Sequence, residues 1–287
     1  MSWKAVVHSA IGTRHYQRQL PCQDYGQYFI ADAVMVGAVA DGAGSARHAE
    51  VGAKLAVQTA LATLQRLIEP ERTIPVAGVD SEPLLPSQSD NSQPQPDLEF
   101  ADLIDADTLT EAQAQQIFTY TVVNVVEALQ VQASTDGYTL ADLACTLLVF
   151  LATPNWMAAM QIGDGFLVIG TAERDYELLF QPAKGEYINE TCFVTSAAAL
   201  EQMQVKVHRS CPRFICAATD GLEKVAIRLQ DWVPFPPFFH PLVEWIRTDP
   251  EVAATCVQNF LESERLNART DDDKTLLLCY YSEEESA

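Results

Sequence analysis

Aspartate residues end three apolar runs of this chain, and a further acidic cluster stands just before another such run. The runs cover residues 34–40, 157–163 and 214–219, and the acidic positions are Asp41, Asp164, Asp220 and the cluster Asp271-Asp272-Asp273. Buried strands hold side chains rigidly, so carboxylates at strand ends can converge on one point. Converging carboxylates repel one another and lose hydration, and a divalent cation that prefers oxygen ligands removes both costs. The sequence therefore predicts a carboxylate-rich metal site made of strand ends.

A single Asp-Gly pair is weak evidence for a metal site, because the same pair is common in tight hairpin turns. The hairpin interpretation suits Asp164-Gly165, where strand-like sequence continues at once. Asp41 and Asp220 are each followed by sequence that leads into a helix-like stretch, and there the alternative is a helix cap. The joint occurrence of all four acidic positions favours the metal site.

Apolar periodicity predicts the elements that must position these carboxylates. Strands are expected at residues 3–9, 26–40 with a break near 31–33, 143–151, 156–162, 166–170, 214–219 and 275–281, and helices at 45–68, from a capping box at Thr110 to Gln113 up to Asp136-Gly137, and at about 250–264. The three runs between 143 and 170 are expected to form a meander of buried strands. The irregular alternation of helices and strands predicts a mixed α/β or α+β fold.

Residues 70–109 differ in composition from the rest of the chain. The stretch 79–97 contains four prolines together with Ser, Gln, Asn and Asp, and few large apolar residues. This composition predicts a Pro/Gln/Asp-rich surface insertion loop within one domain that spans residues 1–287, rather than a domain boundary. A regulatory or partner-binding loop is a second interpretation of the same segment.

The charge of the chain narrows its choice of partners. Thirty-nine acidic residues against 18 Lys and Arg give a formal net charge of −21 over 287 residues. Such a surface repels phosphate backbones, which argues against nucleic-acid binding. A soluble acidic surface is one interpretation of this charge, and a preference for basic partners is the other. No apolar stretch approaches the roughly 20 residues of a membrane span, and no oligomerisation signal is visible, so we expect a monomer that does not bind membranes.

The seven cysteines include no C-x-x-C pair, and several lie inside apolar runs, such as Cys145, Cys216 and Cys279. Buried cysteines of this kind behave as small hydrophobic residues. The pattern indicates a reducing, cytoplasmic compartment rather than a disulfide scaffold. The N-terminal apolar run is interrupted by His8 and followed by Arg14, so it does not fit a signal peptide.

Six motifs, in the same order along nearly the whole chain, resemble those of the PP2C-type (PPM) metal-dependent protein serine/threonine phosphatases. They are Gln23-Asp24, Val39 to Ser45, Ala144-Cys145-Thr146, Ile162 to Gly165, Ala218 to Gly221 and Asp272 to Thr275, and the stretch 185–191 resembles a bacterial subgroup of that family. The resemblance implies an α+β fold, an α/β/β/α sandwich of two packed antiparallel sheets flanked by helices. Helices 45–68 and 110–133 would cover one of the two sheets.

The resemblance also implies a set of ligands for two Mn²⁺ or Mg²⁺ ions. Asp41 would bridge the ions, Gly42 would offer its carbonyl to one of them, and Asp220 and Asp272 would complete the ligands of the other, which makes the three aspartates the catalytic residues. Asp164, with Asp220, would match a weaker site for a third ion. Two close divalent ions lower the pKa of a shared water, and the bridging hydroxide would attack the phosphorus of phosphoserine or phosphothreonine directly.

The residues around the ligands follow the family in part. By resemblance, Gln23 and Asp24 would lie just outside the ligand set and hold metal-bound waters. Many members carry an Arg that binds substrate phosphate at the position of Gln19. The neighbouring Arg18 is predicted to take this role, and Arg14 is near, because the guanidinium fork suits phosphate.

The leaving-group acid has no obvious residue in this chain. Many members have a His at the position of Ala43, and His15, His48 or a metal-bound water are the alternatives. The first expected function is therefore a phosphatase that acts on a phosphorylated protein, with a cognate kinase as a further partner. A catalytically weak or inactive regulator that binds a partner such as a kinase is the second, and a hydrolase of small phosphoesters is the third.

Overall fold

The computed structural model describes residues 2–69, 107–170, 175–181 and 191–282. Most of the expected insertion at 70–109, and the subgroup stretch up to residue 190, lie outside the described residues. Leu109, at the edge of that expected insertion, is buried in the core and is 5% exposed.

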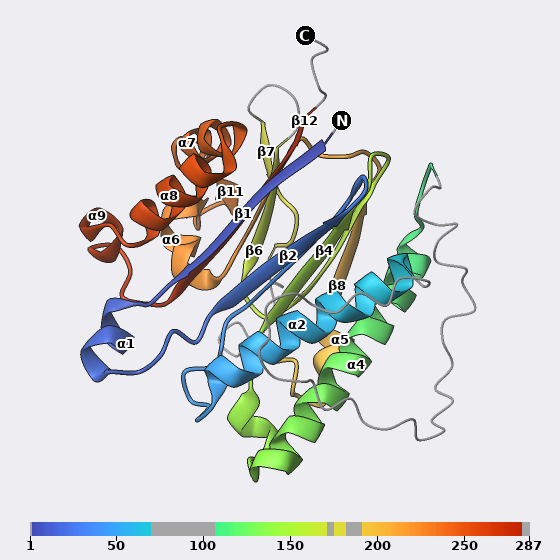
Figure 1. Ribbon diagram of the computed structural model, residues 1–287, viewed down its shortest axis with the longest axis vertical. Helices are drawn as coiled ribbons and strands as arrows, with labels where there is room; N and C mark the ends of the chain where they lie inside the picture. Colours follow the sequence, from blue (N-terminus) through green and yellow to red (C-terminus); the bar gives the residue numbers. More distant parts are fainter. Residues whose placement is uncertain (1, 70–106, 171–174, 182–190, 283–287) are drawn as a thin grey trace.

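Two five-stranded antiparallel sheets face each other and form the centre of the molecule (Figure 1). The first sheet has the order β1-β12-β9-β6-β7, made of Ser2–Ala10, Lys274–Ser282, Phe214–Ala218, Phe166–Gly170 and Tyr176–Leu178. The second has the order β2-β3-β4-β5-β8, made of Tyr25–Ala31, Val34–Ala40, Leu147–Ala152, Met157–Ile162 and Gln204–His208. A small hairpin joins β10 (Ile227–Arg228) and β11 (Val233–Pro234).

Helices cover the outer faces of both sheets. The long helices α2 (Ala49–Ile68) and α4 (Glu111–Asp136) lie on the second sheet, and α7 (Pro236–Arg247) and α8 (Pro250–Leu261) lie on the first. The shorter helices are α1 (Thr13–Arg18), α5 (Ala199–Gln202), α6 (Glu223–Ala226), α9 (Glu264–Asn267) and the 3-10 turns Leu140–Leu143 and Asp220–Leu222. This arrangement confirms the expected α/β/β/α sandwich of the α+β class. Among the described residues, none of the helices combines the length and the apolarity that a membrane crossing needs.

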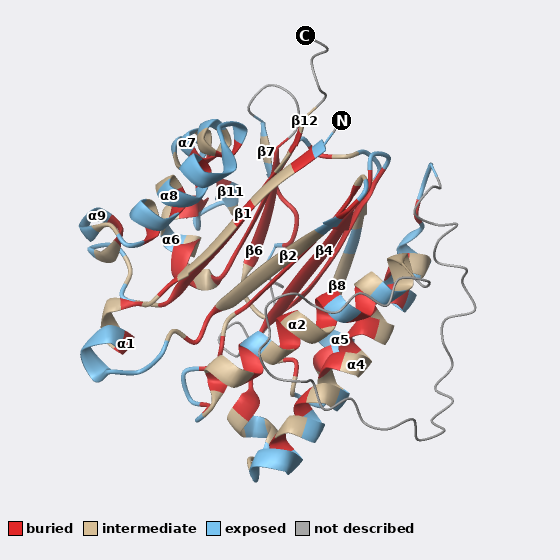
Figure 2. Cartoon of the chain, viewed as in Figure 1, coloured by how far each residue is buried: buried red, intermediate tan, exposed pale blue. Residues whose placement is uncertain are grey.

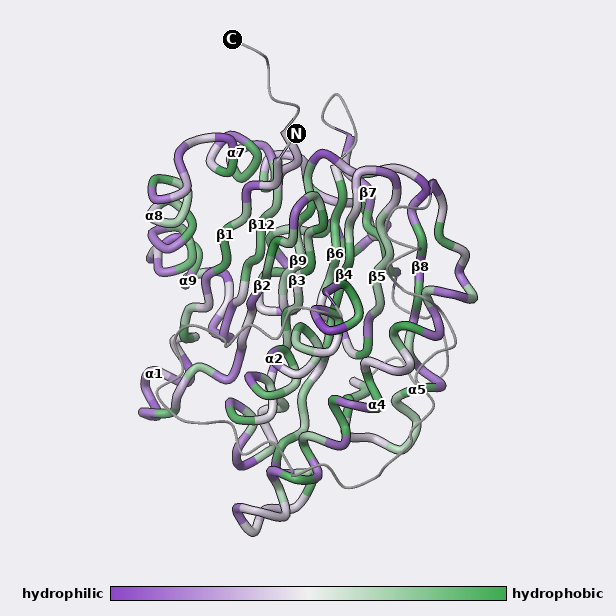
Figure 3. The backbone as a smooth tube through the Cα atoms, turned by 45° about the vertical axis from the view of Figure 1, so that its right-hand side comes forward, coloured by the Kyte–Doolittle hydropathy of each residue, from purple (hydrophilic) through white to green (hydrophobic). Residues whose placement is uncertain are grey.

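Three apolar layers hold the sandwich together. Phe150 and Leu277 are fully buried between the two sheets, Phe118 lies between the second sheet and its helices, and Phe239 lies between the first sheet and its helices. Strands that contact two layers must be apolar on both faces, which is why β3 reads as a continuous apolar run with all seven residues buried. The buried strands stand out in red in Figure 2 and in green in Figure 3.

The helix predicted from the capping box forms as expected. Thr110 accepts a hydrogen bond from the Gln113 N–H at 3.2 Å, and the Gln113 side chain accepts one from the Thr110 N–H at 2.9 Å. The helix ends at Asp136, because Gly137 adopts a left-handed conformation with φ of 73°. The helix expected at 45–68 begins at Ala49.

Helix α7 is not among the helices expected from the sequence. Pro236 and Pro237 occupy the first turn of α7, where proline is tolerated because the missing N–H has no partner within the helix. Pro241 lies one turn further on, inside the helix.

The expected meander of strands between 143 and 170 is wrong in its last step. Strands β4 and β5 pair with each other, but β6 pairs with β9 and β7 in the opposite sheet. The chain therefore crosses from one sheet to the other between Ile162 and Phe166, and Gly163 has a φ of 109°, which only glycine adopts without strain. Asp164-Gly165 lies in this crossover, so the hairpin interpretation of that pair is also wrong.

Candidate metal centre

Three of the predicted carboxylates converge at one end of the sandwich. Asp41 follows β3, Asp164 lies in the crossover between β5 and β6, and Asp220 follows β9. Each offers a carboxylate oxygen, and these oxygens all lie within 4.8 Å of one another. Because β3 and β5 belong to one sheet and β9 to the other, packing of the two sheets brings the three side chains together.

Neither Asp41 nor Asp220 is used as a helix cap. The residue that caps α2 is His48, with no hydrogen bond from its side chain, and Thr219 precedes the turn that begins at Asp220. The helix-cap alternative for these two aspartates is therefore wrong, which leaves their carboxylates available to the cluster.

The cluster is electrostatically unfavourable without a cation. Burial, followed by the charges of Asp41, Asp164 and Asp272, raises the pKa of Asp220 to about 8. Burial and the neighbouring Asp24 likewise raise the pKa of Asp41 well above its ordinary value. A bound divalent ion would reverse both effects, because its positive charge favours the ionised carboxylates. The donor set thus fits a hard cation such as Mg²⁺ or Mn²⁺.

The backbone around Asp41 and Gly42 is held by the Ala144-Cys145-Thr146 motif. The Asp41 N–H donates to Thr146 Oγ1 at 2.9 Å, and the Thr146 N–H donates to the Asp41 carbonyl at 2.8 Å. A Cβ atom at Gly42 would lie 2.7 Å from the Cβ of Ala49 at the start of α2. Glycine is required at this position because any side chain would push α2 away from the loop.

Gln23 and Asp24 are buried beside the cluster and keep unsatisfied acceptors. Asp24 Oδ2 accepts a hydrogen bond from Thr219 Oγ1 at 2.5 Å, whereas Asp24 Oδ1 and Gln23 Oε1 are buried without a hydrogen-bond partner. Buried acceptors of this kind nearly always have a partner in folded proteins. The two atoms fit the predicted role of receiving hydrogen bonds from the waters of a bound ion.

Asp272 lies at the edge of the cluster rather than within it. It is absent from the group of mutually close oxygens, its side chain is 40% exposed, and its Oδ1 accepts a hydrogen bond from Arg14 Nη2 at 3.1 Å. Its charge still contributes to the raised pKa values of Asp41 and Asp220. The structure therefore brings three predicted ligands together and places the fourth beside them, paired with an arginine.

Asp273 is the organising residue that the sequence reasoning missed. It is 3% exposed, and it accepts hydrogen bonds from the Gly12 N–H at 2.6 Å, the Gln23 N–H at 2.6 Å and His15 Nδ1 at 2.8 Å. These bonds fasten the segment from Gly12 to Gln23 to the start of β12. The signal in the sequence was the third acid of the cluster, directly before a buried strand, where an exposed carboxylate would be unusual.

The predicted phosphate-binding residue Arg18 is exposed at the end of α1, while Arg14 is the arginine that contacts the cluster through Asp272. Arg14 Nε is also buried without a hydrogen-bond partner.

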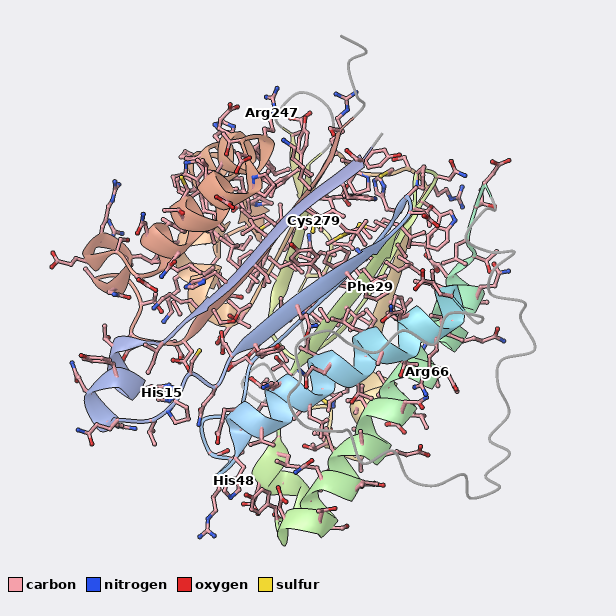
Figure 4. All side chains as sticks on the ribbon, in the orientation of Figure 1. His15, Phe29, His48, Arg66, Arg247 and Cys279 are labelled. Carbon is pink, nitrogen blue, oxygen red and sulfur yellow. The ribbon has the colours of Figure 1, made fainter. Side chains whose placement is uncertain are left out.

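The two histidines considered as the leaving-group acid have other contacts. His15 contacts Asp273, and His48 stacks on Tyr138 with ring centroids 3.7 Å apart. Figure 4 shows His15 at α1 and His48 at the start of α2.

Comparisons with known proteins agree with this site and fold. A family model described as "Protein phosphatase 2C" matches residues 11–262. Serine/threonine-protein phosphatase 3 of Escherichia coli (strain K12) is 30% identical over 292 residues, which cover 99% of this chain and 100% of that protein.

Solved structures share the fold at low sequence identity. The serine/threonine phosphatase Stp1 from Staphylococcus aureus has a TM-score of 0.60 at 12% identity and covers 99% of this chain and 96% of its own. The serine/threonine phosphatase of S. agalactiae has a TM-score of 0.58 at 13% identity and covers 98% of this chain and 100% of its own.

Proposed function

The chain belongs to the protein phosphatase 2C family and is a protein serine/threonine phosphatase, and from this premise we propose how its site acts. We propose that it forms one phosphatase domain that hydrolyses phosphoserine and phosphothreonine with two Mn²⁺ or Mg²⁺ ions, and that Asp164 adds a weaker third site. The observation that carries the proposal is the convergence of Asp41, Asp164 and Asp220 within 4.8 Å.

The metal ligands are assigned from the donor set. Asp41, Asp220, Asp272 and the carbonyl of Gly42 would hold the two ions, and Asp272 would exchange its contact with Arg14 for a contact with an ion. Bound there, a pair of divalent ions supplies an activated water and neutralises charge on the phosphoryl oxygens. The raised pKa values of Asp41 and Asp220 support this assignment, because they result from burial and from like charges, and a nearby cation would offset both.

The surrounding residues orient the water and the substrate. Asp24 and Gln23 would accept hydrogen bonds through Asp24 Oδ1 and Gln23 Oε1, which are buried and unpartnered. A cation of α1 would bind the phosphate of the substrate. Arg18 is the residue predicted from the sequence, and Arg14 is the residue that already contacts the cluster. The general acid is unassigned, since Ala43 is apolar and both candidate histidines have other contacts.

The test is hydrolysis of a phosphothreonine peptide with Mn²⁺ and with excess EDTA, using wild type and Asp220→Ala side by side. We expect turnover only in metal-loaded wild type. Full turnover in EDTA or in the variant would contradict the proposal. Parallel assays with p-nitrophenyl phosphate separate a protein phosphatase from a hydrolase of small phosphoesters.

A catalytically weak regulator is the second candidate function, and Ala43 together with Gln19 is the observation that favours it. Stoichiometric binding of a partner such as a kinase, with no turnover at saturating Mn²⁺, would support that alternative.

The partners that follow from the first function are a phosphorylated protein and the kinase that forms it. We further propose a cytoplasmic location, since all seven cysteines are free and three are fully buried. We also propose a monomer, since a net charge of −21 on each copy opposes association.

A further inference from the structure

A groove with an aromatic floor lies in the helical layer of the first sheet, between α6, α7, the end of α8 and α9. Its volume is about 660 Å³, within the range of pockets that bind ligands of ordinary size. Figure 1 shows these helices gathered at one side of the molecule, away from α2 and α4. The metal-site proposal does not use this groove.

The floor of the groove is made of aromatic rings that contact one another. Phe260 lies 5.7 Å from Phe238 and 5.8 Å from Trp245, measured between ring centroids, and all three line the groove. At the rim, Phe235 is 46% exposed. An exposed aromatic beside partly buried ones is typical of surfaces that bind a partner, because aromatic anchors supply much of the binding energy at interfaces.

The rim of the groove concentrates positive charge on a strongly acidic protein. Four of the chain's 18 Lys and Arg residues line it, namely Lys224, Arg228, Arg265 and Arg269, whereas none of the described acidic residues does. Arg228 is neutralised by a two-pronged contact with Asp231. Over the described ranges, no ion pair of Arg265 or Arg269 is found. These two guanidinium groups are therefore available to carboxylates of a partner.

The groove is lined by residues of the two chain segments that carry the proposed ligands Asp220 and Asp272. Lys224 lies four residues after Asp220, and Arg269 lies three residues before Asp272. Three residues of chain span at most about 11 Å. The end of the groove formed by Lys224 and Arg269 therefore lies near two of the proposed metal ligands, and a substrate segment that enters the groove at this end would be next to the phosphorylated residue.

We propose that this groove binds an acidic segment of the protein substrate that carries large apolar or aromatic side chains, near the phosphorylated residue. The apolar side chains lie on the floor made by Phe238, Trp245 and Phe260, and flanking carboxylates pair with Arg265 and Arg269. The proposal rests on the proposed phosphatase function, which it extends to the class of substrate. A short segment of the substrate fits better than a second copy of the chain, because a second copy brings a further net charge of −21, which opposes association more than the few carboxylates of a segment do.

Direct binding tests the groove without turnover. The probe is a fluorescein-labelled, unphosphorylated peptide with Phe and Leu flanked by Glu, and its binding to the Mn²⁺-loaded protein is followed by anisotropy. One matched peptide carries Gln in place of Glu, and another carries Ala in place of Phe and Leu. We expect the first peptide to bind more tightly than either control, and its affinity to fall with added salt.

Paired variants localise the binding. We expect Arg265→Gln/Arg269→Gln to weaken binding roughly tenfold and Phe235→Ala to weaken it several-fold. The matched control is Arg66→Gln/Lys206→Gln, which removes the same charge from exposed positions on α2 and β8. Figure 4 shows Arg66 on the side of the molecule away from α7 and α8. We expect the control pair to bind the peptide like wild type.

Steady-state kinetics distinguish a failure of the groove proposal from a failure of the proposed phosphatase function. The substrates are two peptides in which the same acidic segment either precedes or follows a phosphothreonine. The groove variants should raise KM for these peptides and leave kcat unchanged. Their hydrolysis of p-nitrophenyl phosphate should match that of wild type. Equal binding of the Gln peptide, or equal weakening by the control pair, would overturn the groove proposal. So would a concentration-dependent dimer in sedimentation that Phe235→Ala dissociates. If metal-loaded wild type hydrolyses no phosphothreonine peptide, that result counts against the phosphatase function instead.

Discussion

Strand β3 contributes to two regions that meet opposite requirements, the core between the sheets and the carboxylate cluster. In the core, Met35 and Val39 lie with Phe150 among apolar neighbours, and these residues are at most 1% exposed. Two residues past Val39, Asp41 lies among like charges that raise its pKa. The core lowers the free energy of the folded state, whereas the cluster raises it until a cation binds. A site that costs stability in this way is typical of function rather than of folding.

The largest effect we expect is the loss of turnover in Asp220→Asn. Removing one ligand charge should lower kcat for a phosphothreonine peptide by about 10³-fold. The same variant should be more stable than wild type in EDTA, because one source of repulsion is gone, and less stabilised by Mn²⁺. Steady-state kinetics and thermal unfolding with and without Mn²⁺ measure both effects. Asp271→Asn, at an exposed neighbour of the cluster, is the control and should change neither.

A substitution in the core should lower stability and leave activity unchanged, the reverse of Asp220→Asn. Phe150→Ala removes a fully buried ring from between the sheets and should cost about 3–5 kcal/mol of unfolding free energy. Urea unfolding measures this cost, with Phe235→Ala at an exposed position as the control. Activity per folded molecule should stay close to that of wild type. A variant that folds normally but loses metal affinity would show that core and cluster are not separate in function.

The stability of the metal-free protein should depend on pH through the carboxylate cluster, and not through the apolar core. The pKa of Asp220 is raised to about 8 in the folded state, against about 3.9 in an unfolded chain. Between these values the folded state binds more protons, so the stability contribution of this group is lost as pH rises from about 4 to about 8. We expect Asp220→Asn to exceed wild type in stability by an amount that grows over this range, in urea unfolding with EDTA. A difference that is constant with pH would contradict this expectation.

The smallest effect concerns the two arginines of α1. If Arg14 binds the substrate phosphate, Arg14→Gln should raise KM about tenfold, and Arg18→Gln, at an exposed position, should leave it close to wild type. Kinetics with a phosphothreonine peptide measure both. The reverse order of effects would favour Arg18, the residue predicted from the sequence.

Much of the fold could be predicted from local signals. Apolar runs located the central strands, and the capping box at Thr110 located the start of α4, because both signals depend on residues close together in the chain. Helix α7 was not predicted. Its segment is rich in proline, but Pro236 and Pro237 occupy the first turn, where proline is tolerated. The partner of β6 was also missed, since strand pairing depends on distant chain segments.

Some residues of the candidate site could also be predicted from the sequence, and others could not. The order of the motifs identified Asp41, Asp164 and Asp220 as a group, and the structure brings them together. Asp273 was not recognised, because its partners Gly12, His15 and Gln23 lie 250 to 261 residues away in the chain. The basic groove was not recognised for the same reason: Lys224 and Arg269 are unremarkable in their own stretches of sequence.

The sequence by itself determined the types of residue at the strand ends, the alternation of helices and strands, and the family to which the chain belongs. Only the tertiary structure decided that β6 crosses to the other sheet, that Arg14 lies on Asp272, and that four cations surround one aromatic groove. The physical reason is the distance along the chain over which each interaction acts. Propensity, capping and apolar periodicity act between neighbours, whereas burial, ion pairing and pKa shifts depend on which distant side chains the packing of the two sheets brings within a few ångströms.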